Sequence, residues 1–312
     1  MVESPTETVE LASGLRFPEG PIWQPDGSVL LVEIARGTLS RVEPDGGVGI
    51  VAELGGGPNG AALGPDGRCY ICNNGGFEWH ERGGRLFPGD QPADYQGGSI
   101  QVVDLKTGAS ETLYDEVATA HGTHSLKGPN DLVFDRSGGF WFTDHGKNRA
   151  RERDRGGLYY ALPDGSSIRE VVYPLDAPNG VGLSPDEDRV YVAETHTGRV
   201  TFWELEAPGV VHPHPRSPHG GHHLHGAAGL QLFDSLAIDS AGNVCVATIA
   251  NGGITVISPD GQTVEHVPTD DVLTTNLCFG GDDRRSAFVT LSSTGRLIRL
   301  PWIRPGLPLA FG

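Results

Sequence analysis

The chain has 312 residues and a formal net charge of −17 at pH 7. A charge of this sign disfavours nucleic acids and anionic membranes as partners, and no apolar run is long enough to span a bilayer. The first residues lack the basic and apolar regions of a secretory signal, and the four cysteines do not make a disulfide framework. These features predict a cytoplasmic enzyme or binding protein.

One sequence pattern recurs six times. Each copy has a loop ending in Pro-Asn-Gly or a variant of it, a short apolar run, a turn and an alternating strand, as in Ala177–Glu194. The copies begin near residues 17, 57, 128, 177, 233 and 275. Their shortest spacing, about 40 residues, matches a four-stranded blade. With 46 glycines, 23 prolines and no long helical pattern, the chain is predicted to be all-β, a single six-bladed β-propeller over residues 1–312.

The first and last parts of the chain suggest how the ring closes. The sixth copy stops one strand short, after Gly295–Leu300, while the strand-like segment Thr8–Ala12 precedes the first copy. An unpaired strand edge is a liability in a β-protein. We therefore expect the N-terminal strand to pair into the last blade and close the ring.

Two segments interrupt the repeats. The second copy carries an insertion at about residues 75–98 that is rich in glycine, charged and aromatic residues, which predicts a loop or lid over one mouth of the ring rather than a strand. Residues 212–227, between the fourth and fifth copies, contain six of the twelve histidines, interleaved with proline and glycine. This segment is predicted to be an exposed irregular loop.

The repeats bring distant residues together. The innermost strand of each blade lines the central channel, so the residues at the strand starts form a ring at one mouth. These residues are two carboxylates and four amides: Glu19, Asn59, Asn130, Asn179, Asp234 and Asn276. Carboxylate and amide oxygens suit a hard divalent cation, above all Ca²⁺, and burying such a set without an ion is costly. The sequence therefore predicts one divalent cation, with Zn²⁺, Mg²⁺ or Mn²⁺ as alternatives to Ca²⁺.

The motifs of the copies also resemble those of a known family. The first copy reads FPEGP, the third PND, the fourth PNGVGLSPDE followed by VYVAET, the fifth LAID and the sixth TNL. Nearly the whole chain is similar, in order, to the SMP-30/gluconolactonase family, which also resembles the diisopropyl fluorophosphatases. The resemblance implies metal ligation by Glu19, Asn130, Asn179 and Asp234. It also implies hydrolysis of sugar lactones with Ca²⁺ or another divalent ion. The fifth copy departs from the family pattern because it is one residue shorter before Ser235.

The resemblance implies metal-assisted hydrolysis, with the cation acting on the lactone carbonyl as a Lewis acid. Catalysis is assigned to Asp234, as general base or nucleophile, together with Glu19. Substrate contacts are assigned to the two remaining ring amides and to four residues near the loops: Asn59, Asn276, His124, His145, Trp79 and Arg82.

Two alternative functions fit the same residues. One is a metal-dependent propeller hydrolase of another ester, such as an organophosphate or an aryl ester, since it would share every predicted ligand. The other is a non-enzymatic propeller that binds a partner, although such a protein has no need of carboxylates that converge in its channel. A small-molecule lactone or ester is the partner that the ring favours.

Overall fold

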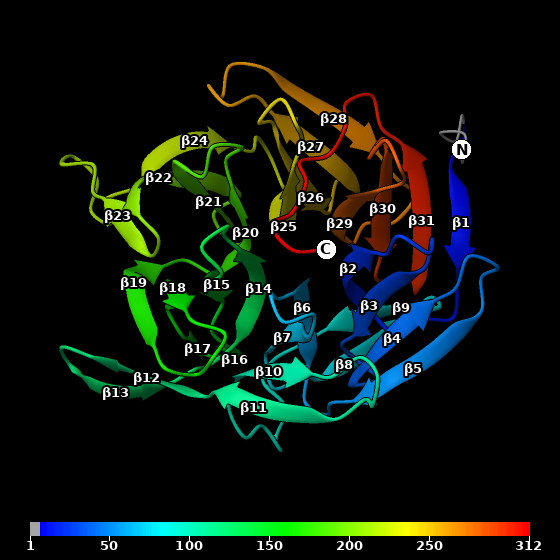
Figure 1. Ribbon diagram of the computed structural model, residues 1–312, viewed down its shortest axis with the longest axis horizontal. Helices are drawn as coiled ribbons and strands as arrows, with labels where there is room; N and C mark the ends of the chain where they lie inside the picture. The colour runs from blue at the N-terminus through cyan, green and yellow to red at the C-terminus, as the bar shows by residue number, and fades with distance from the viewer. Residues whose placement is uncertain (1–6) are drawn as a thin grey trace.

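The computed structural model describes residues 7–312, which form strands and no helix. Six sheets surround a central channel as the blades of a propeller (Figure 1). This arrangement confirms the predicted all-β, six-bladed fold. In the part of the chain that the structure describes, no helix is long and apolar enough to cross a membrane.

The first three blades are antiparallel sheets whose strands follow one another from the channel outward. Blade one contains β2 (Pro18–Trp23), β3 (Val29–Glu33), β4 (Thr38–Val42) and β5 (Val48–Glu53). Blade two contains β6 (Pro58–Leu63), β7 (Cys69–Asn73), β10 (Ser99–Val103) and β11 (Ser110–Tyr114). Blade three contains β14 (Pro129–Phe134), β15 (Phe140–Asp144), β18 (Gly156–Ala161) and β19 (Ile168–Leu175).

The other three blades complete the ring. Blade four contains β20 (Pro178–Leu183), β21 (Arg189–Glu194), β22 (Arg199–Ala207), β23 (Val210–His212) and β24 (His222–Gly226). Blade five contains β25 (Leu232–Ile238), β26 (Val244–Ile249), β27 (Gly253–Ile257) and β28 (Val264–Pro268). Blade six contains β29 (Thr274–Gly280), β30 (Ser286–Leu291), β31 (Arg296–Pro301) and β1 (Val9–Ala12).

The N-terminal strand closes the ring as expected. Strand β1 pairs antiparallel with β31, so that Val9 lies opposite Arg299 and Glu10 opposite Ile298. The two ends of the propeller sequence thus share one sheet, and β31 is not left as an open edge.

Strand alternation explains why the blades pack face to face. Successive side chains of a strand point to opposite faces of its sheet. On β7, Tyr70 packs toward blade three with Phe134, whereas its neighbour Ile71 packs toward blade one with Val32. Both residues are fully buried. Each central strand therefore contributes to two interfaces, which is why its sequence is almost continuously apolar.

Two expectations about the interrupting segments need correction. The insertion at residues 75–98 is not only a loop, because β8 (Trp79–Arg82) and β9 (Arg85–Pro88) form a hairpin within it. The histidine-rich segment is not wholly irregular, because its residues in β24 pair with the first half of β22 while β23 pairs with the second half. The outer edge of the long strand β22 has backbone N–H and C=O groups that need hydrogen-bond partners along its whole length, and β23 and β24 together supply them.

Two further hairpins lie between the blade strands. They are β12 (Glu116–Thr119) with β13 (Gly122–Ser125), and β16 (Asn148–Arg149) with β17 (Glu152–Arg153). The first projects from the outer rim of the ring in Figure 1.

The residues after β31 form a strap across the channel, with the C-terminus near the centre of the ring (Figure 1). Leu307 N donates a hydrogen bond to the Ile238 carbonyl oxygen at 2.9 Å. Farther along, the ring of Phe311 packs edge-on against Phe134 at 5.9 Å between centroids. The strap thus joins blade five to blade three, across the end of the channel opposite the starts of the inner strands.

The strap is anchored by a buried ion pair. Arg304 Nε donates to Asp239 Oδ2 at 2.6 Å, and the Asp239 side chain is fully buried. Replacing Arg304 with methionine would leave this carboxylate without its charged partner, so we expect a loss of about 2–3 kcal/mol of stability and a melting temperature lower by several degrees. Arg41→Met is the matched control, because its partner Asp26 is largely exposed. Equal melting temperatures for Arg304→Met and wild type would show that the anchor is unimportant.

Candidate functional site

The six predicted ring residues lie at the starts of the six inner strands and are all buried. Their exposed fractions lie between 2% for Glu19 and 8% for Asp234. Asp234 keeps the register of its equivalents despite the shorter fifth copy, because Phe233 pairs with Thr248 as Pro178 pairs with Glu194 in blade four. The structure therefore gathers at one end of the channel all six residues that the repeats place in register.

A shift in strand register lies at or next to the ring position in every blade. Such bulges turn two consecutive residues toward the same side. In three blades the second residue is glycine, and a Cβ at Gly20, Gly60 or Gly180 would lie 2.5–2.7 Å from the backbone of the next inner strand. Only a residue without a side chain fits these three positions.

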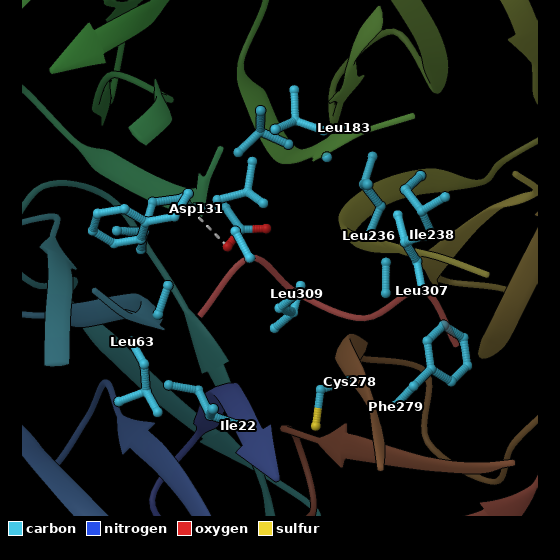
Figure 2. Close-up of a pocket in the computed structure, with 18 of the residues that line it drawn as sticks. Ile22, Leu63, Asp131, Leu183, Leu236, Ile238, Cys278, Phe279, Leu307 and Leu309 are labelled. Atoms are coloured by element: carbon cyan, nitrogen blue, oxygen red, sulfur yellow. Dashed lines mark hydrogen bonds between the residues drawn. The ribbon is translucent and has the colours of Figure 1, made fainter. Parts of the chain in front are cut away.

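In blades three, five and six the second residue is not glycine but Asp131, Ser235 and Leu277, and all three are buried. Asp131 faces the channel beside the ring, where Figure 2 shows its carboxyl group. The sequence pattern did not indicate Asp131, because a regular strand would point it away from the channel side taken by Asn130. The signal that could have found it is the absence of glycine after Asn130 in the third copy.

Hydrogen bonds order part of the ring. Glu19 Oε2 accepts from Asn276 Nδ2 at 2.7 Å and from the Gly20 backbone N–H at 2.8 Å. Asn179 Nδ2 donates to Thr195 Oγ1 at 3.1 Å, so the Asn179 oxygen points the other way and accepts from the Ser235 hydroxyl at 3.3 Å. These contacts fix the side chains of Glu19 and Asn179.

The three channel carboxyl groups perturb one another. Burial raises the pKa of Glu19 to about 7, against the effect of its hydrogen bonds. Burial and the charge of Glu19 raise the pKa of Asp131 to about 8. The same two causes raise the pKa of Asp234 well above its ordinary value. Ionising all three at neutral pH therefore requires positive charge nearby.

The ring fits a cation bound by oxygen atoms. Within residues 7–312, none of the three carboxyl groups forms an ion pair with lysine or arginine. Asn130 Oδ1 is buried and has no hydrogen-bond partner in the same part of the chain, which is unusual for a buried acceptor. Among the described residues no three His, Cys, Asp or Glu side chains are grouped as a metal site, so a cation in the ring would need amide oxygens as ligands.

The other predicted substrate residues are placed differently. His145 follows β15 at the ring end of blade three, and Trp79 on β8 packs its ring 5.0 Å from that of Phe17. Arg82 is exposed at the tip of the β8–β9 hairpin. His124 is exposed on β13, in the hairpin at the outer rim, so the structure does not bring it to the channel.

An apolar chamber of about 120 Å³ lies in the channel between Asp131 and the strap (Figure 2). The far halves of the inner strands line it with side chains such as Ile22, Leu63 and Leu236, and Leu309 of the strap covers it. Apolar walls on this side help to keep water from Asp131, and this burial contributes to its raised pKa.

The insertion is held over blade two by a buried lysine. Lys147, which is 2% exposed, donates from Nζ to the carbonyl oxygens of Asn74, at 3.0 Å, and Gly76. The same Nζ lies 4.2 Å from the ring centroid of Phe77 and 5.5 Å from that of Tyr95. These contacts tie the insertion to blade three, and the insertion forms one wall of a second cavity of about 540 Å³ between blades one and two.

Replacing Lys147 with methionine should release the insertion. Two carbonyl groups would lose their charged donor and a cation–π contact would be lost, at a local cost of about 2 kcal/mol. We expect amide hydrogen exchange in residues 74–98 to become at least tenfold faster while the blade strands keep their protection. Lys127→Met, at an exposed position nearby, serves as the control. Unchanged exchange in the insertion would contradict its attachment by Lys147.

The chain is similar to known proteins over most of its length. A family model described as the SMP-30/Gluconolactonase/LRE-like region matches residues 17–293. A gluconolactonase of Zymomonas mobilis is 26% identical, covering 93% of this chain and 80% of its own length. The lactonase drp35 of Staphylococcus saprophyticus is 29% identical, covering 80% of this chain and 68% of its own length.

Solved structures show the same fold. A gluconolactonase from Xanthomonas campestris superposes with a TM-score of 0.72 at 24% identity, covering 96% of this chain and 89% of that one. Regucalcin from Agrobacterium tumefaciens, described as a calcium-binding protein, superposes with a TM-score of 0.69 at 17% identity, covering 95% of each chain.

Proposed function

Because this chain belongs to the SMP-30/gluconolactonase/LRE-like family, we propose that it is a metal-dependent hydrolase that opens a lactone ring. The observation that carries the proposal is the convergence of Glu19, Asp131 and Asp234 with the ring amides at one end of the channel. The relatives' names, gluconolactonase and lactonase, indicate the substrate class. The calcium-binding description of the regucalcin neighbour favours Ca²⁺.

Glu19, Asn130, Asn179 and Asp234 are the proposed ligands. The free, buried oxygen of Asn130 and the oxygen of Asn179 supply neutral donors, and the two carboxylates supply charge. A divalent cation bound there would polarise the lactone carbonyl and stabilise the developing oxyanion. Asn276 holds Glu19 through its hydrogen bond of 2.7 Å, so we assign Asn276 as a positioning residue for that ligand.

Asp234 is the proposed general base or nucleophile. Asn276 and the Gly20 backbone N–H both donate to Oε2 of Glu19, and these hydrogen bonds make the Glu19 carboxylate a weaker base. Burial and the charge of Glu19 raise the pKa of Asp234 well above its ordinary value, and a bound cation would keep this carboxylate ionised, as a general base must be. As a base, Asp234 would take a proton from the attacking water and return it to the ring oxygen when the ring C–O bond breaks, leaving a hydroxy acid.

A lactone panel tests this function. The purified protein, loaded with Ca²⁺, should release acid from lactones such as glucono-δ-lactone well above the spontaneous rate. Excess EDTA should remove the activity, Ca²⁺ should restore it, and Asp234→Asn should lack it. The same panel includes aryl esters and organophosphates, and faster hydrolysis of one of these than of any lactone would indicate a different ester specificity. If the Ca²⁺-loaded protein accelerates the hydrolysis of no lactone, the proposal is wrong. If activity is complete in EDTA, the hydrolysis does not depend on a metal.

A further inference from the structure

Two histidine rings meet beside the amide residues of the ring. The backbone N–H of His145 donates to the Gly128 carbonyl oxygen at 2.9 Å, two residues before Asn130. His196 directly follows Thr195, whose hydroxyl accepts the hydrogen bond from Asn179. The two imidazoles contact each other across the boundary of blades three and four, with centroids 5.6 Å apart and planes at 68°. His145 and His196 thus form a histidine wall that flanks the ring end of the channel.

The ring nitrogens of the histidine wall are largely unused by the protein. Nδ1 of His145 lies 3.3 Å from the Gly146 carbonyl oxygen, and within residues 7–312 neither imidazole has another hydrogen bond. His196 is exposed and His145 is half-buried. Polar side-chain atoms beside a channel mouth that are not bonded within the protein are available to a ligand.

The charge state of the histidine wall limits which ligand it suits. Burial, His196 and the cations Lys147 and Arg153 lower the pKa of His145 to about 4. Burial and Arg153 also lower the pKa of His196, against the effect of Asp176. Neutral imidazoles each offer one donor and one acceptor. Such groups match hydroxyl groups, which also donate and accept, better than they match a carboxylate.

We propose that His145 and His196 are substrate-binding residues that hydrogen-bond the hydroxyl groups of a polyhydroxylated lactone and thereby favour it over an unsubstituted lactone of the same ring size. The inference rests on the proposed lactonase function. A site built to hydrogen-bond a substrate hydroxyl discriminates against the analogue that lacks it, because its polar groups then lose their partners.

The test compares two six-membered lactones, glucono-δ-lactone and δ-valerolactone, on the Ca²⁺-loaded protein. His145→Phe keeps an aromatic ring but removes both nitrogens. It should raise KM for glucono-δ-lactone about tenfold, the loss of about one hydrogen bond, and change KM for δ-valerolactone less than about twofold. His196→Phe should act in the same direction. His145→Asn, which retains a donor and an acceptor, should recover part of the lost affinity.

His121→Phe is the matched control, since that histidine is exposed at the turn of the β12–β13 hairpin, and it should leave both KM values unchanged. Melting temperatures of the variants identify any that fail to fold, and His145→Asn then carries the comparison. Equal effects of His145→Phe on the two lactones, or none on either, would overturn the histidine wall as a specificity device. A wild-type protein that hydrolyses neither lactone nor any other in the panel would instead overturn the proposed function.

Discussion

Replacing Glu19 with glutamine, or Asp234 with asparagine, should weaken Ca²⁺ binding at least about 100-fold. Each change keeps the shape of the side chain but removes one of the two negative charges proposed to ligate the cation. In a channel where these residues are buried, even a moderate effective dielectric makes that loss worth about 3 kcal/mol or more. Isothermal titration calorimetry of the protein stripped with EDTA measures both the affinity and the stoichiometry, which should be one.

The ring amides provide a graded series for the same titration. Asn130→Ala and Asn179→Ala remove neutral ligand oxygens and should weaken Ca²⁺ binding less than the charge changes. Asn276→Ala removes the hydrogen bond to Glu19 Oε2, so we expect a smaller loss through the position of that carboxylate. The repeat pattern alone provides no reason to separate Asn276 from Asn59.

Asn59 is the matched control in this series, since it is buried in the same ring but is not a proposed ligand. Asn59→Ala should bind Ca²⁺ as wild type does, with any effect confined to KM or kcat. If Asn59→Ala abolished binding while Glu19→Gln retained it, the ligand assignment would be wrong although the propeller fold would stand.

In the absence of metal, the protein should become less stable as the pH rises from about 5 to 7.5. Glu19 and Asp131 have folded-state pKa values of about 7 and 8, raised by burial from 4.5 and 3.8. Over this pH range the folded state therefore retains protons that the unfolded chain has released, so the free energy of unfolding falls with pH. A shift of this size for Glu19 alone corresponds to about 3 kcal/mol, and the total effect should be a few kcal/mol.

Melting temperatures in EDTA and in Ca²⁺, measured between pH 5 and 7.5, check this prediction. In EDTA the melting temperature should fall as the pH rises. In Ca²⁺ it should rise or stay level, because a bound cation favours the ionised carboxylates and stabilises the folded state by mass action. Asp131→Asn should flatten the slope in EDTA, whereas Asp45→Asn, in an exposed turn, should not. A slope in EDTA that is zero, or identical in Asp131→Asn and wild type, would show that the channel carboxyl groups are not coupled to folding in this way.

Much of the architecture could be predicted from the sequence because it depends on repetition. Six copies of one strand-and-turn pattern can bury their apolar faces only against one another, and the ring needed Val9–Ala12 to complete its last sheet. The same repetition placed Glu19 and Asp234 in one register although they are far apart in the chain. These inferences required only the period of a strand and the equivalence of the copies.

The tertiary structure decided the features that depend on departures from that period. Asp131 joins the channel because a bulge turns two successive residues inward, whereas a regular strand would point it away from Asn130. His196 becomes a partner of His145 only through the packing of blade four on blade three. The strap across the channel has no counterpart in the repeats, and Arg304 anchors it through a contact with Asp239 that no local pattern encodes. Bulges, inter-blade contacts and the C-terminal strap are set by how the blades pack together, and for that reason they could be read only from the folded chain.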